Sequence, residues 1–410
     1  MLGFTLACVH VHHGLRREAE NDAEFVRCLC ERFELPFHLE RVTIRRQPPW
    51  EGLEAEARRA RHAALEARAL ALGAPRIATG HTADDQAETV LMRLVEGAGP
   101  RGLAGIAPAR GAFIRPLLDV RREDIVAHLV ARELAWVEDA TNRDLHFLRN
   151  RIRHDILPFL ARALGPNVVE SLCRSAALAR RVITDLERQA RSELDGAATR
   201  GMAGVVLPVA TLRRLPEELA VQVLLLAAAD LGDLRPRRGV VLRGLRGVLV
   251  DHATRRRVTL GRLCVERSGR WVRIGPKALP SLVARHLSVP GSIAFSEIGM
   301  RIDACVIERT ADYIVPRDAR RVGFDADHMP RACRVRARRP GDRFAPFGGP
   351  GERRLKSFLI DAGIPRWERA RIPLLDVDGE IVWVAGVRRS QRAPVGPRTK
   401  RILEVTLHSL

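Results

Sequence analysis

The first third of this 410-residue chain alternates short strand-like runs with longer helix-like runs. Apolar residues in the helix-like runs recur three and four positions apart, the spacing of an amphipathic helix. The strand-like runs are residues 5–11, 37–44 and 76–79, and the helix-like runs are residues 20–33, 52–72 and 83–95. This alternation predicts an α/β domain with a parallel sheet over residues 1–160.

The remaining chain predicts two further domains. Residues 149–231 carry Leu and Ala stripes and are expected to be wholly helical, whereas residues 240–307 are expected to form shorter β segments. We therefore predict a mainly helical middle domain, residues 161–325, and a small α+β domain, residues 326–410. The expected elements of the latter are strands at 333–336, 381–385 and 402–407 around a helix at 355–362.

The charge balance predicts an anionic partner. The chain has 69 Lys and Arg against 49 Asp and Glu, a formal net charge of +20. Its lysines are Lys277, Lys356 and Lys400, so a coding bias toward arginine is evident. Such a bias explains arginine replacing lysine but not an excess of positive charge, which favours nucleic acid as the partner.

Other protein classes are disfavoured. The apolar runs are too short to span a bilayer, and Met1 opens a strand-like run rather than a signal peptide, so we expect no membrane segment and a cytoplasmic location. The seven cysteines include no Cys-x-x-Cys pair. Neither a disulfide framework nor a zinc or iron–sulfur site is predicted.

One segment combines a turn with carboxylates at the start of a helix: Gly80-His-Thr-Ala-Asp-Asp-Gln-Ala-Glu-Thr89. Asp84 and Asp85 could ligate Mg²⁺ that carries nucleotide phosphates. Alternatively they cap the helix, with Asp85 and Glu88 as a capping box.

Further motifs accompany this segment in a fixed order. They are His12-His-Gly-Leu-Arg16, Glu54-Ala55, Ala57-Arg58, Arg61, Arg93-Leu94, Gly97-Ala-Gly99, Arg101-Gly-Leu-Ala-Gly105, Arg115-Pro-Leu-Leu118, Arg121, residues 139–142 and Arg149-Asn-Arg-Ile-Arg153. Toward the C-terminus follow Arg338-Arg-Pro-Gly-Asp-Arg-Phe344, Lys356, Pro365, Arg371-Ile-Pro-Leu-Leu375 and Trp383-Val-Ala-Gly386. Together they resemble the tRNA(Ile)-lysidine synthetases, enzymes of the PP-loop ATP-pyrophosphatase class. The resemblance implies an adenine nucleotide alpha hydrolase-like fold for residues 1–160.

The reaction that this resemblance implies joins free lysine to C2 of the wobble cytidine of isoleucine tRNA. ATP first adenylates the cytidine, and lysine then displaces AMP. ATP and Mg²⁺ are the implied cofactors, and isoleucine tRNA and free lysine the implied partners; a homodimer is compatible with it. A related PP-loop tRNA thiolase is an alternative, which the absence of a Cys-x-x-Cys pair disfavours.

The resemblance also implies site residues. Catalytic roles fall to Asp84, Asp85 and Arg61, with Asp84 and Asp85 as the Mg²⁺ ligands. Nucleotide contacts are expected at His12, His13, Arg58, Gly80, His81 and Arg115, and tRNA contacts at Arg149, Arg153, Arg338, Arg343 and Lys356.

These assignments have plainer alternatives. The histidines could be structural, and exposed arginines are often merely solvated. Arg149 and Arg153 could form salt bridges with Asp139 or Asp144 instead of holding a phosphate. His62 stands where the family usually has Tyr.

The first strand and phosphate loop of the family, Ser-Gly-Gly-x-Asp-Ser, have no counterpart in this sequence. We expect either that the start was assigned internally or that this is a paralogue. A protein without the loop is expected to bind tRNA without forming lysidine.

The C-terminal domain is expected to hold tRNA. Arg334, Arg336 and Arg338 occupy alternate positions, which on a strand would place three positive charges on one face. Such a face favours a polyanion.

Overall fold

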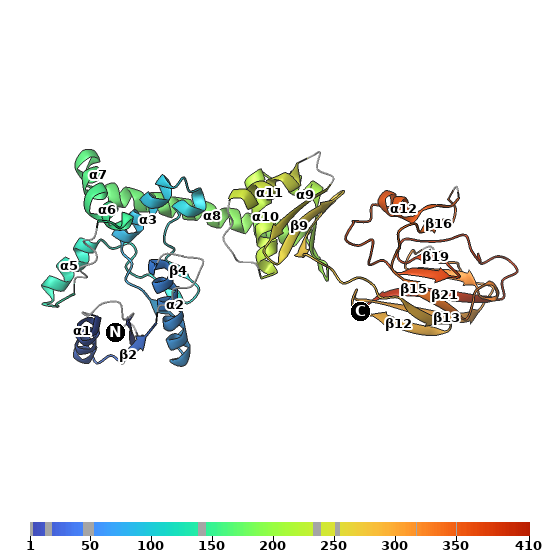
Figure 1. The fold of residues 1–410 in the computed structure, drawn as a ribbon, viewed down its shortest axis with the longest axis horizontal. Helices are drawn as coiled ribbons and strands as arrows, with labels where there is room; N and C mark the ends of the chain where they lie inside the picture. The colour runs from blue at the N-terminus through green and yellow to red at the C-terminus, as the bar shows by residue number, and fades with distance from the viewer. Residues whose placement is uncertain are drawn as a thin grey trace. The chain divides into compact units, whose positions relative to one another are not determined.

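The computed structural model describes residues 3–12, 19–43, 53–137, 145–232, 239–250, 255–316, 318–349 and 351–410. The chain divides into two compact units, Met1–Thr184 and Asp185–Leu410. Figure 1 shows the elements of each unit, coloured along the chain.

The first unit contains two small sheets with parallel pairing, as expected for an α/β domain. Strand β1 (Cys8–His12) lies parallel to β2 (Phe37–Arg41), and β3 (Ile77–Ala78) lies parallel to β5 (Phe113–Ile114). Strand β4 (Ala109–Arg110) pairs antiparallel with β5. The predicted strands are thus present, although shorter than expected. Helices α1 (Ala19–Arg32) and α2 (Leu53–Ala71) also match their predictions.

The rest of the first unit is helical. Its helices are α3 (Ala83–Val95), α4 (Pro100–Leu103), α5 (Arg122–Ala131), α6 (Leu148–Arg151), the π-helical turn η2 (Ile152–Ile156), α7 (Leu157–Leu164) and the first part of α8 (Val168–Ala197). Helix α3 begins and ends where the sequence predicted. Its alanines Ala83 and Ala87 lie one turn apart and pack on Ile152, Leu157 and Val169, which anchors α3 to the following helices.

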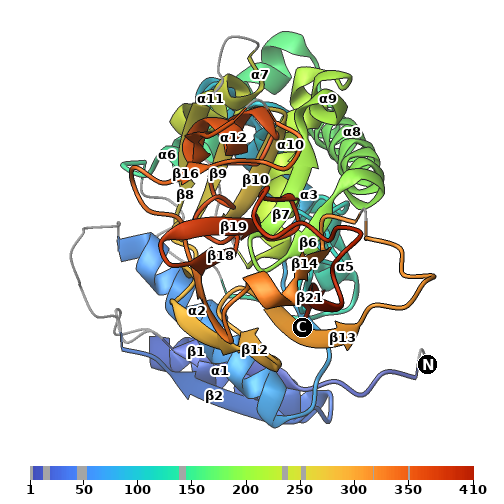
Figure 2. The same cartoon turned by 90° about the vertical axis from the view of Figure 1, so that its right-hand side faces the viewer.

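The second unit begins with a five-stranded antiparallel sheet in the order β6-β7-β10-β9-β8 (Figure 2). Its elements are β6 (Thr199–Gly201), β7 (Gly204–Pro208), α9 (Val209–Arg213), α10 (Glu217–Asp230), α11 (Gly239–Leu249), β8 (Arg255–Leu260), β9 (Leu263–Ser268) and β10 (Trp271–Pro276). Helices and sheet share one apolar core that includes Leu194, Leu207, Leu224 and Ile274.

Two local predictions for this region were wrong. The hairpin β6–β7 interrupts the stretch expected to be wholly helical, and α11 occupies residues expected to be β. Residues 240 and 241 are both valine, which favours a strand, but Leu245 and Val248 are fully buried at helical spacing. Packing against the core therefore decided this segment rather than local propensity.

The C-terminal part stacks two antiparallel sheets, in the orders β11-β15-β18-β19-β20 and β12-β13-β21-β14. Its elements are β11 (Arg285–Ser288), β12 (Gly291–Phe295), β13 (Met300–Glu308), β14 (Arg321–Asp325), the 3-10 turn η3 (Ala326–His328), β15 (Ala332–Arg336), β16 (Arg343–Phe344), β17 (Arg353–Arg354), α12 (Leu355–Asp361), β18 (Leu374–Val377), β19 (Glu380–Val384), β20 (Arg388–Arg389) and β21 (Arg401–Ser409). Phe295, Phe324 and Trp383 lie fully buried in its core. The helix and the three strands predicted here are present at their expected positions.

The expected domain boundary after residue 325 separates strands that pair with each other in these two sheets. Strand β13 lies antiparallel to β21, and β11 lies antiparallel to β15. The strands between residues 285 and 308 therefore belong with the C-terminal sheets. Sequence patterns gave no sign of this because the paired strands lie far apart in the chain; Met300, for example, pairs with Ser409.

Arg336 is a structural residue of this region and not a surface cation. It is 5% exposed, and its guanidinium donates to Asp376 at 2.6 Å and to Asp342 at 2.9 Å. Arg334, two residues earlier, is exposed. The expectation of three equivalent arginines on one face was wrong, because the strand ends at Arg336 and the following turn brings Asp342 back onto its side chain.

We predict that Arg336→Gln lowers the free energy of unfolding by about 3–5 kcal/mol, since it leaves two carboxylates without their buried partner. Arg334→Gln, the matched control on the same strand, should change it by less than about 0.5 kcal/mol. Urea denaturation measures both values. Equal effects of the two substitutions would contradict the structural role of Arg336.

Candidate nucleotide site

The turn between β3 and α3 positions the carboxylates of the segment of residues 80–89. Thr82 is the N-cap of α3, and the Asp85 carboxylate accepts from the Thr82 backbone N–H at 2.9 Å and from its hydroxyl at 3.1 Å. The Thr82 hydroxyl in turn accepts from the Asp85 backbone N–H. The capping box is therefore formed by Thr82 and Asp85, and not by Asp85 and Glu88 as one alternative expected.

Asp84 connects α3 with the start of α5. Its carboxylate accepts from the Arg122 backbone N–H at 2.6 Å and from Arg121 Nε at 3.3 Å. Arg122 is the first residue of α5, where a backbone N–H has no partner within the helix. Asp84 thus supplies the acceptor that the N-terminus of α5 requires.

Four charged side chains form a closed cluster beside these carboxylates, which we call the four-charge cluster: Asp85, Glu88, Arg149 and Arg153. Glu88 is fully buried and accepts from Arg149 Nε at 2.7 Å and from Arg153 Nε at 2.6 Å. Asp85 Oδ1 accepts from Nη2 of the same two arginines, at 2.9 and 3.2 Å. Each arginine therefore bridges both acids, and the charges balance.

The four-charge cluster changes the interpretation of the arginine pair. Arg149 and Arg153 lie one helical turn apart, where like charges repel unless an anion lies between them. Here Asp85 and Glu88 are those anions. The alternative partners Asp139 and Asp144 lie outside the described residues, and the tRNA contact expected of this pair stays a prediction. The sequence analysis singled out Asp85 but gave Glu88 no role beyond the cap.

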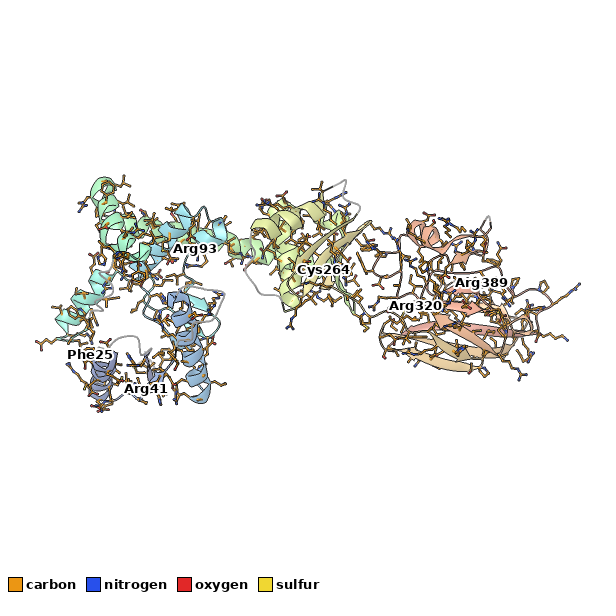
Figure 3. All side chains as sticks on the ribbon, viewed as in Figure 1. Phe25, Arg41, Arg93, Cys264, Arg320 and Arg389 are labelled. Atoms are coloured by element: carbon orange, nitrogen blue, oxygen red, sulfur yellow. The ribbon has the colours of Figure 1, made fainter. Side chains whose placement is uncertain are left out.

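A small basic pocket of about 240 Å³ lies next to the cluster within the first unit. It brings together Arg58 from α2, His81 from the turn and Arg115, three residues expected to contact a nucleotide. Arg93, on α3 (Figure 3), and Arg110 also line the pocket, although neither was predicted to contact the nucleotide. The remaining lining residues are Thr89, Gly105, Ile106, Ala107 and Arg149.

Arg115 is the most enclosed cation of this pocket. It is 8% exposed, and its Nη1 donates to the Ala107 carbonyl at 2.8 Å, whereas its buried Nε has no partner among the described residues. Burial lowers the pKa of Arg115, and the neighbouring charges of Arg58 and Arg110 lower it further. Repulsion among these arginines is relieved when an anion enters, so the pocket favours a phosphate or carboxylate ligand.

His81 contributes a neutral ring to the pocket. Its Nδ1 lies 3.0 Å from the Thr79 hydroxyl. Burial lowers the pKa of His81 below its ordinary value of 6.5; nearby Asp85 opposes this effect and Arg115 adds to it. At neutral pH the imidazole is therefore a hydrogen-bonding group and not a further positive charge.

The segment beneath the pocket is fixed by Gln86 and Arg180. The Gln86 amide accepts from the Ile106 backbone N–H at 2.6 Å and donates to the Ile106 carbonyl at 3.2 Å. Arg180 donates to the Ala104 and Ile106 carbonyls at 3.1 and 2.9 Å. Gly105 has a φ of +63°, and a Cβ there would lie 2.5 Å from the Gln86 Oε1. Only glycine fits this position without displacing Gln86.

Of the other residues predicted for the nucleotide, His12 and Gly80 do not line the pocket. His12 is buried at the end of β1, with Nε2 3.5 Å from Glu20 Oε1, and His13 lies outside the described residues. Gly80 immediately precedes His81 in the turn. Arg61 is exposed on α2, and His62 packs on Phe113 with 4.4 Å between ring centroids.

The predicted tRNA-binding residues of the second unit are more accessible. Lys356 is exposed on α12, Arg338 is partly exposed, and the exposed Arg343 pairs with Glu352 at 2.6 Å. Their contacts with tRNA remain predictions. Among the described residues, no group of three or more His, Cys, Asp or Glu side chains could hold a metal ion, and no helix is long and apolar enough to cross a membrane.

Comparisons with known proteins identify both ends of the chain. The PP-loop domain family matches residues 1–160, and the family described as the TilS substrate C-terminal domain matches residues 333–405. Together with the parallel strand pairs and the basic pocket, the first match defines a protein of the PP-loop class.

Relatives along the full chain narrow this class. A tRNA(Ile)-lysidine synthase of Symbiobacterium thermophilum is 37% identical over 98% of this chain and 88% of the relative. Another, of Geobacter sulfurreducens, is 34% identical over the same shares. A crystal structure of a TILS C-terminal domain is 28% identical and covers 31% of this chain and 98% of that structure, with a TM-score of 0.28. The chain belongs to the tRNA(Ile)-lysidine synthase family.

We predict that Gly105→Ala lowers the free energy of unfolding by about 2–3 kcal/mol. The left-handed backbone accounts for about 1–2 kcal/mol, and the displaced Gln86 hydrogen bonds add about 1 kcal/mol. Gly111→Ala is the matched control, because Gly111 has a φ of +60° but nothing within 4 Å of a new Cβ. If urea denaturation gives both variants the same loss, the Gln86 contact contributes nothing to stability.

Proposed function

We propose that this protein ligates free lysine to C2 of the wobble cytidine of isoleucine tRNA and uses ATP to do so. Family membership supports the reaction class, and the relatives with this name align over nearly the whole chain. The observation in this chain that carries the proposal is the basic pocket, which gathers five arginines and a neutral histidine at the end of a β strand. Such a pocket suits the phosphates of a nucleotide.

In the first proposed step, O2 of the cytidine attacks the α-phosphorus of ATP. A phosphorus–oxygen bond forms to the base, the bond to the leaving oxygen breaks, and pyrophosphate departs with the electron pair. Arg58, Arg93 and Arg115 are proposed to neutralise the charge that develops on the phosphates. The volume of about 240 Å³ lies below the range of about 300–1,000 Å³ that encloses a drug-sized ligand, so we assign it to the phosphates alone.

In the second proposed step, the lysine ε-amine attacks C2 and AMP leaves with the C2–oxygen electron pair. The ammonium must lose a proton before it can attack, and a carboxylate is the natural partner for the incoming amine. We propose that Asp85 orients it and that Asp84 and Arg61 contribute to the same step. The four-charge cluster and Thr82 fix the position of Asp85, and the incoming amine would replace one of its arginine donors.

A magnesium role for Asp84 and Asp85 fits this arrangement poorly. Both oxygens of each carboxylate already accept hydrogen bonds, from Thr82, Arg149 and Arg153 at Asp85 and from residues 121 and 122 at Asp84. An ion would have to displace arginine nitrogens to reach them. No step is therefore derived through Mg²⁺, and the positive charge in the proposed mechanism comes from the arginines.

We further propose that the second unit binds the tRNA. Its cations Arg338, Arg343 and Lys356 are exposed or partly exposed, as suits a surface that holds phosphates. Since the strands from Arg285 onward pair with the C-terminal strands, we propose that the C-terminal tRNA-binding domain includes them.

The proposed activity predicts that the protein incorporates radiolabelled lysine into a tRNA(Ile) transcript in the presence of ATP. One AMP and one pyrophosphate should be released per lysine, and a transcript with uridine at the wobble position should accept none. Binding of tRNA without release of AMP is the outcome expected of a protein without the Ser-Gly-Gly-x-Asp-Ser loop, and it would instead support a role in tRNA binding without catalysis.

For the pocket, we predict that Arg115→Ala raises the dissociation constant for ATP about 10- to 100-fold, the effect of losing one charge-assisted hydrogen bond. Arg132→Ala is the control, because Arg132 is exposed beyond α5 and does not line the pocket. Isothermal titration with ATP measures both. An unchanged affinity in Arg115→Ala would remove the pocket from the proposed site.

A further inference from the structure

A second and larger basic pocket, of about 480 Å³, lies within the second unit. Six of its lining side chains are cationic: Arg256, Arg257, Arg267, Arg273, Lys277 and Arg366. Glu266 is the one carboxylate among its lining residues. None of these residues was singled out by the sequence analysis, because they are spread over 110 residues of the chain.

Two parts of the second unit meet at this pocket. Arg256 and Arg257 come from β8, and Lys277 follows β10, whereas Arg366 comes from the loop after α12. The Arg366 backbone N–H donates to the Ser268 hydroxyl at 2.9 Å, and the Arg273 guanidinium lies 5.8 Å from the ring centroid of Trp367. These contacts hold the loop against the end of the five-stranded sheet.

The inner cations of the pocket are already paired. Arg273 is 1% exposed and donates to Glu266 at 2.7 Å and to the Ala203 and Pro276 carbonyls at 2.9 Å each. Arg267 donates to the Val250 carbonyl at 2.7 Å. The one carboxylate is thus neutralised, so it cannot compensate the charges at the rim.

The rim cations are not paired in this way. Arg256, Lys277 and Arg366 are all exposed, and no described carboxylate forms an ion pair with any of their side chains. Three positive charges therefore surround one concavity, and the charged groups beneath them, Arg273 and Glu266, are already paired with each other. Their mutual repulsion is relieved by a ligand that carries several negative oxygens.

We infer that this pocket binds phosphate groups of the tRNA backbone, remote in sequence from the nucleotide site. The inference rests on the proposed function only in taking tRNA as the substrate. A pocket of about 480 Å³ is larger than one phosphate needs and suits a phosphodiester with its adjoining sugars. Because the cations come from both the sheet and the loop, a bound phosphate would also tie these two parts together. Free pyrophosphate, which shares the same chemistry, is the other source of such a ligand.

The test measures tRNA affinity at several salt concentrations for the full chain. Arg366→Gln should reduce the magnitude of the slope of log affinity against log salt by about 1, the effect of one lost phosphate contact. The triple variant Arg256→Gln, Lys277→Gln, Arg366→Gln should reduce this magnitude further. Arg262→Gln is the matched control, since Arg262 is exposed in the turn between β8 and β9 and does not line the pocket. It should leave the slope unchanged, and the charge-preserving Arg366→Lys should retain most of it.

Two results would overturn the inference. The first is an unchanged slope in the triple variant; if calorimetry then shows that this variant has lost pyrophosphate binding, the pocket serves a free anion. The second is an equal reduction in Arg262→Gln, which would indicate a general charge effect. If the slope falls as expected while the protein incorporates no lysine, the pocket inference stands and the proposed ligation fails.

Discussion

The first unit depends on one interaction, the pairing of two buried or half-buried carboxylates with two arginines. Glu88 is fully enclosed, and an ionised carboxylate in that position is stable only if donors compensate its lost hydration. Arg149 and Arg153 supply these donors and also reach Asp85. The four-charge cluster thereby fixes α3 against α6 and η2. The start of α3 carries the turn that places His81 in the basic pocket.

The cluster and the pocket distribute charge in opposite ways. Within the cluster every charge has a partner, which fixes the orientation of its four side chains. Within the pocket, burial and the charges of Arg58 and Arg110 lower the pKa of Arg115, and its buried Nε has no partner among the residues described. Arg149 belongs to both, since it pairs with the acids and lines the pocket. A ligand anion would therefore meet an arginine whose orientation is already set, which reduces the entropy lost on binding.

The second unit uses arginine in the same two ways. Arg336 and Arg273 are buried and hold loops in place through carboxylates and carbonyls. Arg256, Arg366 and Lys277 remain at the surface around a concavity. A net charge of +20 therefore overstates the cations available to an anionic partner, because many of the arginines bond within the protein.

The sequence by itself determined the elements whose signals are local. Residues 83–95 were predicted as a helix with its observed bounds, because apolar spacing and a capping residue are sufficient to define one. The ordered motifs likewise identified the family, and the resemblance predicted Arg58, His81 and Arg115 as nucleotide-binding residues. Only the tertiary structure decided which partners these residues have. In the folded protein Arg149 and Arg153 pair with Glu88, and Arg336 is buried although Arg334, two residues earlier, is exposed. Residues 239–249 form a helix, and the larger pocket is lined by residues of β8 and of a loop 110 residues away. Burial and ion pairing depend on which segments pack together, and a pattern read along one segment contains no information about the others.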